Sequence, residues 1–368
     1  MLTTNLAQGG AEAQVFRLSL ELRRRGWEVA VVSLLPPTSY AGALEDAGVR
    51  VFSLGMRPGK PDPRGFFRLA ALLKRLRPQV LHSHMFHANL LARLARLVCP
   101  VPVVISTLHS AAESAREAAS TRARDRLYRL TDPMANAVVA VSRAAAERHA
   151  LCGAVRRAKL RVIPNGVDTA VFRPDPERRA RVRRELGFDS EFLWLAAGRL
   201  MWKKDYATLL RAFGQLGGGA LAIAGAGPLE DGLKRLATEC GGLVRFLGQV
   251  DDVPALMNAA DGFVLSSLVE GLPVALLEAA ASGLPPVATE VGGVREILGE
   301  EAGLVVPPGD PAALAAAMRR VSALPVEGRE RMSRAARAVA VARFDLSVVV
   351  SQWEAAYREL LENASQWM

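Results

Sequence analysis

Two glutamates, Glu270 and Glu278, stand where they could hold a polar ligand. A short apolar strand over 262–265 leads into the loop that carries Glu270, and Pro273 stands where the first helical residue tolerates a missing N–H. We predict a helix over 274–281. Helical side chains lean toward the N-terminus of their helix, so we expect Glu278 to point back toward Glu270. The free N–H groups of a helix start favour an anion or a hydroxyl-rich ligand, and two solvated acids are the alternative interpretation.

A cationic loop precedes these acids. The predicted strand over 192–197 runs into Gly198, and Arg199 and Lys204 follow on the loop. A guanidinium can bind two phosphate oxygens while an ammonium acts as a point charge, so this pattern suits a diphosphate. Two exposed loop cations are the alternative. A Gly-x-Gly turn at 225–227 lacks the third glycine of a dinucleotide fingerprint, which disfavours a dehydrogenase.

Glycines and histidines mark strand ends in the first half of the chain. Gly10 belongs to a turn from the first strand into a helix, and glycine lets a backbone approach a ligand closely. His84 and His109 each come at the carboxyl end of a predicted strand, where open α/β sheets bind ligands. His82 and His84 lie on one face of their strand, a spacing that could ligate a metal. No carboxylate or cysteine stands at a suitable spacing nearby, so we predict no metal site, and His82 fits a structural role about as well.

Length and composition indicate an α/β protein of two domains. The chain has 368 residues, and its strands alternate with helices, which predicts parallel sheets covered by helices. Cys99, Cys152 and Cys240 are far apart, so we predict neither a disulfide nor a zinc site. No apolar run is long enough to span a membrane, and the N-terminus lacks the features of a signal peptide. We therefore expect a cytoplasmic protein.

Positive charge is concentrated in the first half. Residues 1–165 contain 25 Lys and Arg against 11 Asp and Glu, a net +14, whereas residues 166–368 contain 22 against 26, a net −4. No nucleic-acid motif accompanies the basic residues, so we expect no nucleic-acid partner. A peripheral position on anionic or polyprenyl-phosphate lipids at the inner face of the plasma membrane fits better. A solvated arginine-rich surface fits as well.

Taken in order, these motifs resemble those of the retaining glycosyltransferase family 4. The run E-G-L-P-V-A-L-L-E at 270–278 is similar to the Glu-x7-Glu signature of the family, and G-R-L…K-D at 198–205 to its diphosphate clamp. G-G-A-E at 9–12 resembles its first loop, and N-G-V-D at 165–168 the segment between its domains. Pro286 departs from the usual aliphatic residue. The few residues before the first loop indicate a clipped start or a short first strand.

The resemblance spans nearly the whole chain and implies an α/β protein of GT-B fold, in which two Rossmann-like domains with parallel sheets face each other across a cleft. We expect an acceptor-binding domain over residues 1–170 and a nucleotide-sugar-binding domain over 171–346. We expect a C-terminal helix over 347–368 that crosses back to the first domain.

The resemblance also implies an activity. The expected enzyme moves a hexose from a UDP- or GDP-linked donor to a glycan, lipid-linked or small-molecule acceptor with retention of configuration, as in the assembly of cell-envelope polysaccharides. It needs no cofactor, and the absence of an Asp-x-Asp pair favours a reaction without a metal. Front-face attack and double displacement stay open as mechanisms. A nucleotide-sugar epimerase of the same architecture and a non-catalytic scaffold of a glycan-assembly complex stay open as alternatives.

By this resemblance, the candidate site residues fall into three groups. The catalytic candidates are His109, Arg199, Lys204 and Glu270. The donor-binding candidates are Gly10, Gly198, Gly227, Gly271, Leu272, Pro273 and Glu278. The acceptor-side candidates are His84, His87 and Asn89.

Overall fold

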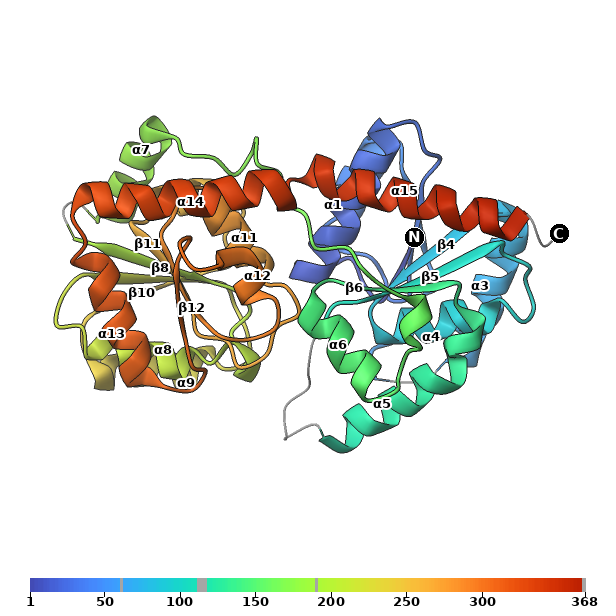
Figure 1. Cartoon of the computed structure of the whole chain (residues 1–368), viewed down its shortest axis with the longest axis horizontal. Helices are drawn as coiled ribbons and strands as arrows, with labels where there is room; N and C mark the ends of the chain where they lie inside the picture. Colours follow the sequence, from blue (N-terminus) through green and yellow to red (C-terminus); the bar gives the residue numbers. More distant parts are fainter. Residues whose placement is uncertain (60–61, 111–117, 189–190, 366–368) are drawn as a thin grey trace. The chain divides into compact units, whose positions relative to one another are not determined.

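The structure is a computed structural model that describes residues 1–59, 62–110, 118–188 and 191–365. The chain divides into two compact units (Figure 1). Unit 1 comprises Met1–Asn165 together with Leu346–Met368, and unit 2 is Gly166–Asp345. The division falls after Asn165 rather than after residue 170, and the segment that returns to unit 1 begins at Leu346.

Unit 1 is built on a seven-stranded sheet of order β3-β2-β1-β4-β5-β6-β7, in which every pair of neighbours is parallel. Its strands are β1 (Leu2–Thr3), β2 (Ala30–Ser33), β3 (Arg50–Ser53), β4 (Val80–His84), β5 (Val103–Leu108), β6 (Ala137–Ala140) and β7 (Leu160–Val162). Its α-helices are α1 (Gly10–Arg24), α2 (Ala41–Asp46), α3 (Pro63–Leu76), α4 (Phe86–Ala95), α5 (Ala118–Thr131), α6 (Arg143–Leu151) and α15 (Leu346–Ser365). Parallel strands need crossover connections, and helices supply them here.

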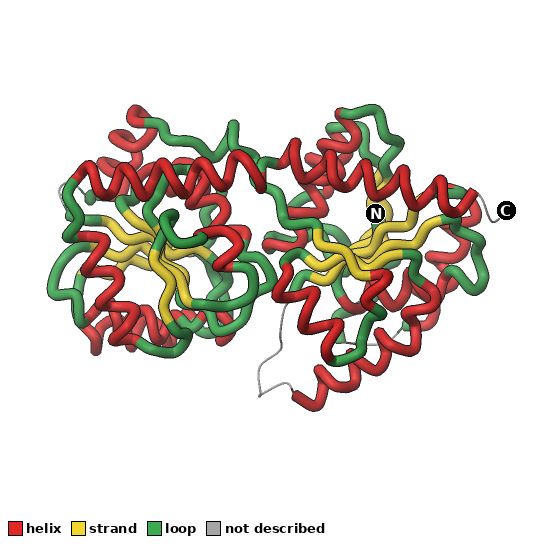
Figure 2. The backbone as a smooth tube through the Cα atoms, viewed as in Figure 1, coloured by secondary structure: helices red, strands yellow, loops and turns green. Residues whose placement is uncertain are grey.

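Unit 2 is built on a six-stranded parallel sheet of order β10-β9-β8-β11-β12-β13. Its strands are β8 (Leu193–Ala197), β9 (Ala220–Ala224), β10 (Leu243–Gly248), β11 (Gly262–Leu265), β12 (Pro286–Thr289) and β13 (Leu304–Val306). Its α-helices are α7 (Pro176–Leu186), α8 (Tyr206–Gly214), α9 (Glu230–Cys240), α10 (Val253–Ala259), α11 (Val274–Ala281), α12 (Val294–Leu298), α13 (Pro311–Ser322) and α14 (Val326–Phe344). Figure 2 shows helices on both faces of each sheet. Two Rossmann-like α/β units, as predicted, make up the chain.

The helix α15 packs on the first helix of the chain, although more than 300 residues separate the two. Its Trp353 and Tyr357 join Val15 and Leu22 of α1 in one buried apolar cluster. Helical spacing of these apolar residues gives α15 a continuous face to bury. The terminal helix is therefore a structural part of unit 1.

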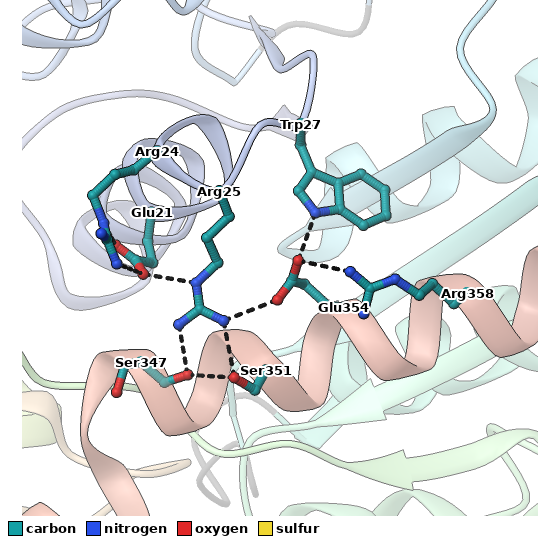
Figure 3. A network of polar contacts seen from close by, with 8 residues as sticks. All are labelled: Glu21, Arg24, Arg25, Trp27, Ser347, Ser351, Glu354 and Arg358. Atoms are coloured by element: carbon teal, nitrogen blue, oxygen red, sulfur yellow. Dashed lines mark hydrogen bonds and ion pairs between the residues drawn. The ribbon is translucent and has the colours of Figure 1, made fainter.

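A polar network fixes α15 against α1 beside this apolar cluster (Figure 3). Glu354 is buried and accepts hydrogen bonds from Trp27 Nε1 at 2.8 Å and from Arg25 Nη1 at 2.9 Å. Arg25 also donates to Glu21 at 2.7 Å, and Arg358 donates to Glu354 at 3.1 Å. Because charge-assisted hydrogen bonds are directional, they set the rotation and register of α15 on unit 1.

Candidate functional site

One of the candidate cations, Lys204, and one of the candidate acids, Glu270, meet at the point where the sheet of unit 2 reverses its strand order. β8 and β11 are neighbours, while β9 extends the sheet on one side and β12 on the other. Open α/β sheets bind ligands at the carboxyl ends of the strands at such a point. Lys204 follows β8 and Glu270 follows β11. The topology thus brings them to one edge of the sheet.

Lys204 and Glu270 form an ion pair at this edge. Lys204 Nζ lies 2.6 Å from Glu270 Oε1, and the two side chains are 22% and 13% exposed. The buried Ser267 donates its hydroxyl to the same carboxylate oxygen at 2.7 Å. An ammonium has three donors, so Lys204 can keep this contact and still bind a phosphate oxygen. Partial removal from water strengthens both interactions.

Backbone contacts hold the two loops together. The carbonyl of Lys204 accepts a hydrogen bond from the Ser266 hydroxyl at 2.8 Å, and that of Lys203 accepts one from the N–H of Leu268 at 2.8 Å. Asp205 is the N-cap of α8, and its side chain accepts a hydrogen bond from Thr208 N at 3.3 Å. The 3-10 turn that carries Lys204 is therefore fixed at both ends.

Glycines let the loops after β8 and β9 approach each other. The N–H of Gly198 donates to Ala224 O at 2.9 Å, and that of Leu200 donates to Ala226 O at 3.0 Å. A Cβ at Gly227 would lie 2.4 Å from Leu200 O, and one at Gly225 would lie 2.1 Å from Gly198 O. A glycine at position 227 thus lets the two loops pack without a clash. The contact of Gly227 with a donor stays a prediction.

Tyr206, the first residue of α8, was not selected from the sequence but contacts the loop after β8. Its hydroxyl donates to Gly198 O at 3.0 Å and its ring is buried. Burial and the nearby charge of Glu270 raise the pKa of Tyr206, so the hydroxyl stays protonated and keeps donating. Tyr206 therefore fixes the turn at Gly198 through this hydrogen bond.

The helix α11 covers the residues predicted for its body, whereas Pro273 is its N-cap rather than its first helical residue. Glu278 and Leu272 are both buried. The loop before α11 is backed by a glycine pair, since Gly293 N donates to Gly271 O at 2.8 Å. A Cβ at Gly292 would lie 2.4 Å from Glu270 O. Arg199, by contrast, lies exposed on the loop after β8.

In unit 1 the structure brings His84 and His109 together. His84 Nδ1 lies 3.1 Å from His109 Nε2. Burial lowers the pKa of His109 to about 4 and that of His84 well below its ordinary value. Both rings are therefore neutral near pH 7, where one can donate to the other. The two candidates are one hydrogen-bonded pair.

His82 has a structural role. Its Nδ1 lies 2.7 Å from the hydroxyl of Tyr357 on α15, and its Nε2 lies 2.7 Å from Thr107 Oγ1. The ring is 1% exposed, and both its nitrogens are satisfied. His82 thus connects two strands of the sheet to the terminal helix.

The remaining candidates in unit 1 differ in exposure. Asn89 is fully buried, and its Nδ2 donates to Thr107 O at 2.9 Å and to Tyr128 OH at 3.1 Å. His87 is exposed on α4, and partial burial together with the charge of Arg124 lowers its pKa. Gly10 is the first residue of α1. Their contacts with substrates stay predictions.

Asp125, His149 and Cys152 are the one group of potential metal ligands found in the described part of the chain, with ligand atoms within 4.8 Å of one another. The guanidinium of Arg148 already contacts two of these three side chains. It binds both carboxylate oxygens of Asp125, at 2.6 and 2.7 Å, and its Nη1 lies 3.0 Å from His149 Nδ1. A guanidinium at this position opposes a second cation, so this group does not support a metal site.

Comparison with known proteins connects these features to a family. Residues 178–339 match the family described as glycosyl transferases group 1, and residues 8–171 match glycosyltransferase family 4. A GDP-mannose-dependent alpha-(1-6)-phosphatidylinositol monomannoside mannosyltransferase of Mycobacterium tuberculosis is 37% identical over 165 residues, which are 40% of this chain and 43% of the relative. The chain thus spans less than half the length of this curated relative.

Two other similarities cover nearly the whole chain. A glycogen synthase of Mycobacterium tuberculosis is 28% identical over 93% of this chain and 89% of its own length. The crystal structure of HepE from Anabaena in complex with UDP superposes with a TM-score of 0.85 at 22% identity, covering 97% of this chain and 98% of that one. The fold is therefore that of the GT-B glycosyltransferases, and with both halves matched in order the chain belongs to the family 4 glycosyltransferases.

Proposed function

We propose that the protein transfers a hexose from a UDP- or GDP-linked sugar to a hydroxyl of a glycan or lipid-linked acceptor, with retention of configuration and without a metal. The observation that carries this proposal is the cluster of Lys204, Glu270 and Ser267 at the switch point of unit 2. A cation and an acid side by side suit a ligand that is a diphosphate at one end and a polyol at the other.

The donor would be held through both of its ends. Glu278, buried in α11, would accept hydrogen bonds from ribose hydroxyls, and Glu270 with the backbone of Gly271 and Leu272 would hold the sugar. Lys204 and Arg199 would stabilise the negative charge that grows on the departing diphosphate, an electrostatic contribution that is usually the largest in catalysis. Clustered cations would thus replace a metal ion.

Retention would follow from a front-face displacement. The bond from the anomeric carbon to the diphosphate oxygen breaks, and its electron pair leaves with the diphosphate. The acceptor hydroxyl forms the new bond on the same face, and its proton passes to an oxygen of the leaving phosphate. His109, neutral near pH 7, would contact the sugar without competing for this proton.

The names of the relatives support a lipid-linked or glycan acceptor. One acts on a phosphatidylinositol mannoside, and a galactosyltransferase of Escherichia coli, 28% identical over 63% of the chain, is named for a diphosphoundecaprenol acceptor. None of the helices in the described residues has the length and apolar character of a membrane span. We propose peripheral binding through α3 to α5, where Phe67 and Leu130 are about 70% exposed among arginines.

A binding screen followed by a turnover assay tests the proposal. The protein is melted with UDP, GDP, UDP-glucose or GDP-mannose, and a bound nucleotide raises the melting temperature. Under the proposal, the sugar is lost from its nucleotide only when an acceptor is added, and the anomeric configuration is kept. Turnover should also survive EDTA. Conversion of the sugar without an acceptor would indicate an epimerase, and failure to bind any nucleotide sugar would indicate a scaffold.

A further inference from the structure

In the hydrogen bond between His84 and His109, the surroundings of His84 indicate which ring donates and which accepts. His84 is 2% exposed, and its Nε2 has no hydrogen-bond partner among the described residues, whereas its Nδ1 lies 3.1 Å from His109 Nε2. A buried N–H without a partner is rarer and more costly than a buried acceptor without one. His84 therefore carries its proton on Nδ1 and donates it to His109.

The second ring must then carry its proton on the other nitrogen. Because His109 Nε2 accepts from His84, the neutral ring of His109 has its hydrogen on Nδ1. The contact with His84 uses Nε2 of His109 and does not involve this N–H. His109 lines a small cavity of about 20 Å³ together with His84 and Gln14. We infer that His84 is a positioning residue that fixes His109 as a neutral Nδ1–H donor toward the transferred sugar.

Packing around His84 holds the donor ring in place. The ring of His82 packs against it at a tilt of 38°, with a centroid distance of 4.1 Å, and the ring centroid of Trp353 on α15 lies 4.4 Å from that of His82. His82 is itself fixed through Tyr357 and Thr107. The orientation of His109 therefore depends on a stack that reaches the terminal helix. This inference rests on the proposed function for the sugar contact, whereas the protonation of His109 does not.

Nuclear magnetic resonance of the free protein tests the protonation without any activity. The chain has only five histidines, so long-range proton–nitrogen spectra of ¹⁵N-histidine-labelled protein can be assigned by removing single rings. The expected result is an Nδ1–H tautomer of His109 that is lost in the His84→Ala variant. An Nε2–H tautomer of His109 in the unmodified protein overturns the inference. So does an Nδ1–H tautomer of His109 that persists in the His84→Ala variant. Tyr357→Phe is the matched control, since it disturbs the same stack without touching the pair.

Kinetics test the consequence for transfer. His84→Ala should lower kcat on the order of tenfold with little change in KM, the size of one lost hydrogen bond. In the His109→Ala background the same change should cost nothing further, because His84 acts only through His109. His84→Asn, whose amide nitrogen takes the place of Nδ1, should restore more activity than His84→Gln. If His84→Ala lowers kcat as much in the His109→Ala background as in the unmodified protein, His84 does not act by positioning His109. An unmodified protein without transferase activity would instead refute the proposed function and leave the tautomer result standing.

Discussion

At the scale of single residues, the ion pair of Lys204 and Glu270 holds a cation and a carboxylate in fixed positions relative to each other. Its partial burial keeps a cation in a fixed position before any ligand arrives. A charge that is already oriented need not be reorganised during the reaction, which is what makes such groups effective. Ser267 restrains the carboxylate so that it does not rotate away with the lysine.

Replacing Lys204 by Ala should lower kcat/KM by about 10²- to 10³-fold, because one group that stabilises developing charge is lost. The melting temperature should change little, since a partly exposed ion pair contributes only about 1 kcal/mol or less. Steady-state kinetics with the best nucleotide sugar measure the effect. Lys203→Ala in the same turn is the control, because Lys203 Nζ lies over the Trp202 ring, 5.2 Å from its centroid. Equal losses in both variants would remove Lys204 from the mechanism.

The buried histidines make stability depend on pH. Burial lowers the pKa of His82 and His84, and that of His109 to about 4, whereas an exposed histidine has a pKa of about 6.5. Between these values the unfolded chain binds more protons than the folded one, so the free energy of unfolding falls as pH decreases. Each ring that stays neutral adds a slope of about 1.4 kcal/mol per pH unit.

Urea midpoints at about pH 7 and about pH 5.5 measure this dependence. The midpoint should be lower at the more acidic pH, and the difference should shrink in His109→Gln, which has one titrating ring fewer. A His109→Gln variant with the full pH difference would contradict the lowered pKa of His109.

At the scale of elements, the site depends on loops that approach more closely than side chains permit. Gly227→Ala should destabilise unit 2 by about 1–3 kcal/mol, because its Cβ would overlap Leu200 O. Nucleotide affinity should fall with it, since the same displacement moves the turn that carries Lys204. Thermal melts with and without nucleotide measure both effects. Gly218→Ala is the control, since a Cβ there meets nothing within 4 Å.

The helix α15 offers a matched pair of acids for testing its attachment. Glu354→Ala should lower the free energy of unfolding of unit 1 by about 1–3 kcal/mol, because Trp27 Nε1 loses its acceptor in a buried place. Glu359→Ala removes an ion pair with Arg161 on the same helix, where Glu359 is 54% exposed, and should cost less than about 1 kcal/mol. Denaturant titrations compare the two. Equal effects would mean that the network in Figure 3 adds nothing to the apolar packing.

The sequence predicted elements best where apolar runs have clear stops. The helix at 274–281 and the strand at 262–265 have the predicted bounds. Pro273 and Gly283 punctuate the helix on either side. Gly10 was predicted to belong to the turn before the first helix but is the first residue of that helix, since a glycine with low helix propensity is tolerated in the first turn. The strand predicted over 192–197 begins one residue later, at Leu193, because the apolar Phe192 packs against the core from the loop.

The site was predictable to the level of loops but not of contacts. Strand order could be expected to bring Lys204 and Glu270 to one edge. Ser267 and Gly292 carry no local signal, because their roles arise only when distant loops meet. Asn89 has a side chain that could bind a ligand, yet in the structure its amide nitrogen donates hydrogen bonds to residues inside unit 1.

At the scale of the whole molecule, the two units carry opposite net charge, and this asymmetry predicts how the protein meets a membrane. Residues 1–165 carry a net +14. We expect the protein to bind vesicles that contain phosphatidylglycerol and to leave neutral phosphatidylcholine vesicles unbound. Flotation should weaken between about 0.1 M and about 0.5 M salt, as charges are screened. Salt-independent binding, or equal binding to neutral vesicles, would contradict this prediction.

Unit 1 is discontinuous in the chain, with all of unit 2 inserted between its two parts. During synthesis the strands of unit 1 leave the ribosome first, but Trp353 and Tyr357, which cover His82, arrive only after residue 345. Domains generally fold as units once their residues are available. Unit 2 can therefore mature before unit 1, and the half that is translated first would be the half that depends longest on chaperones.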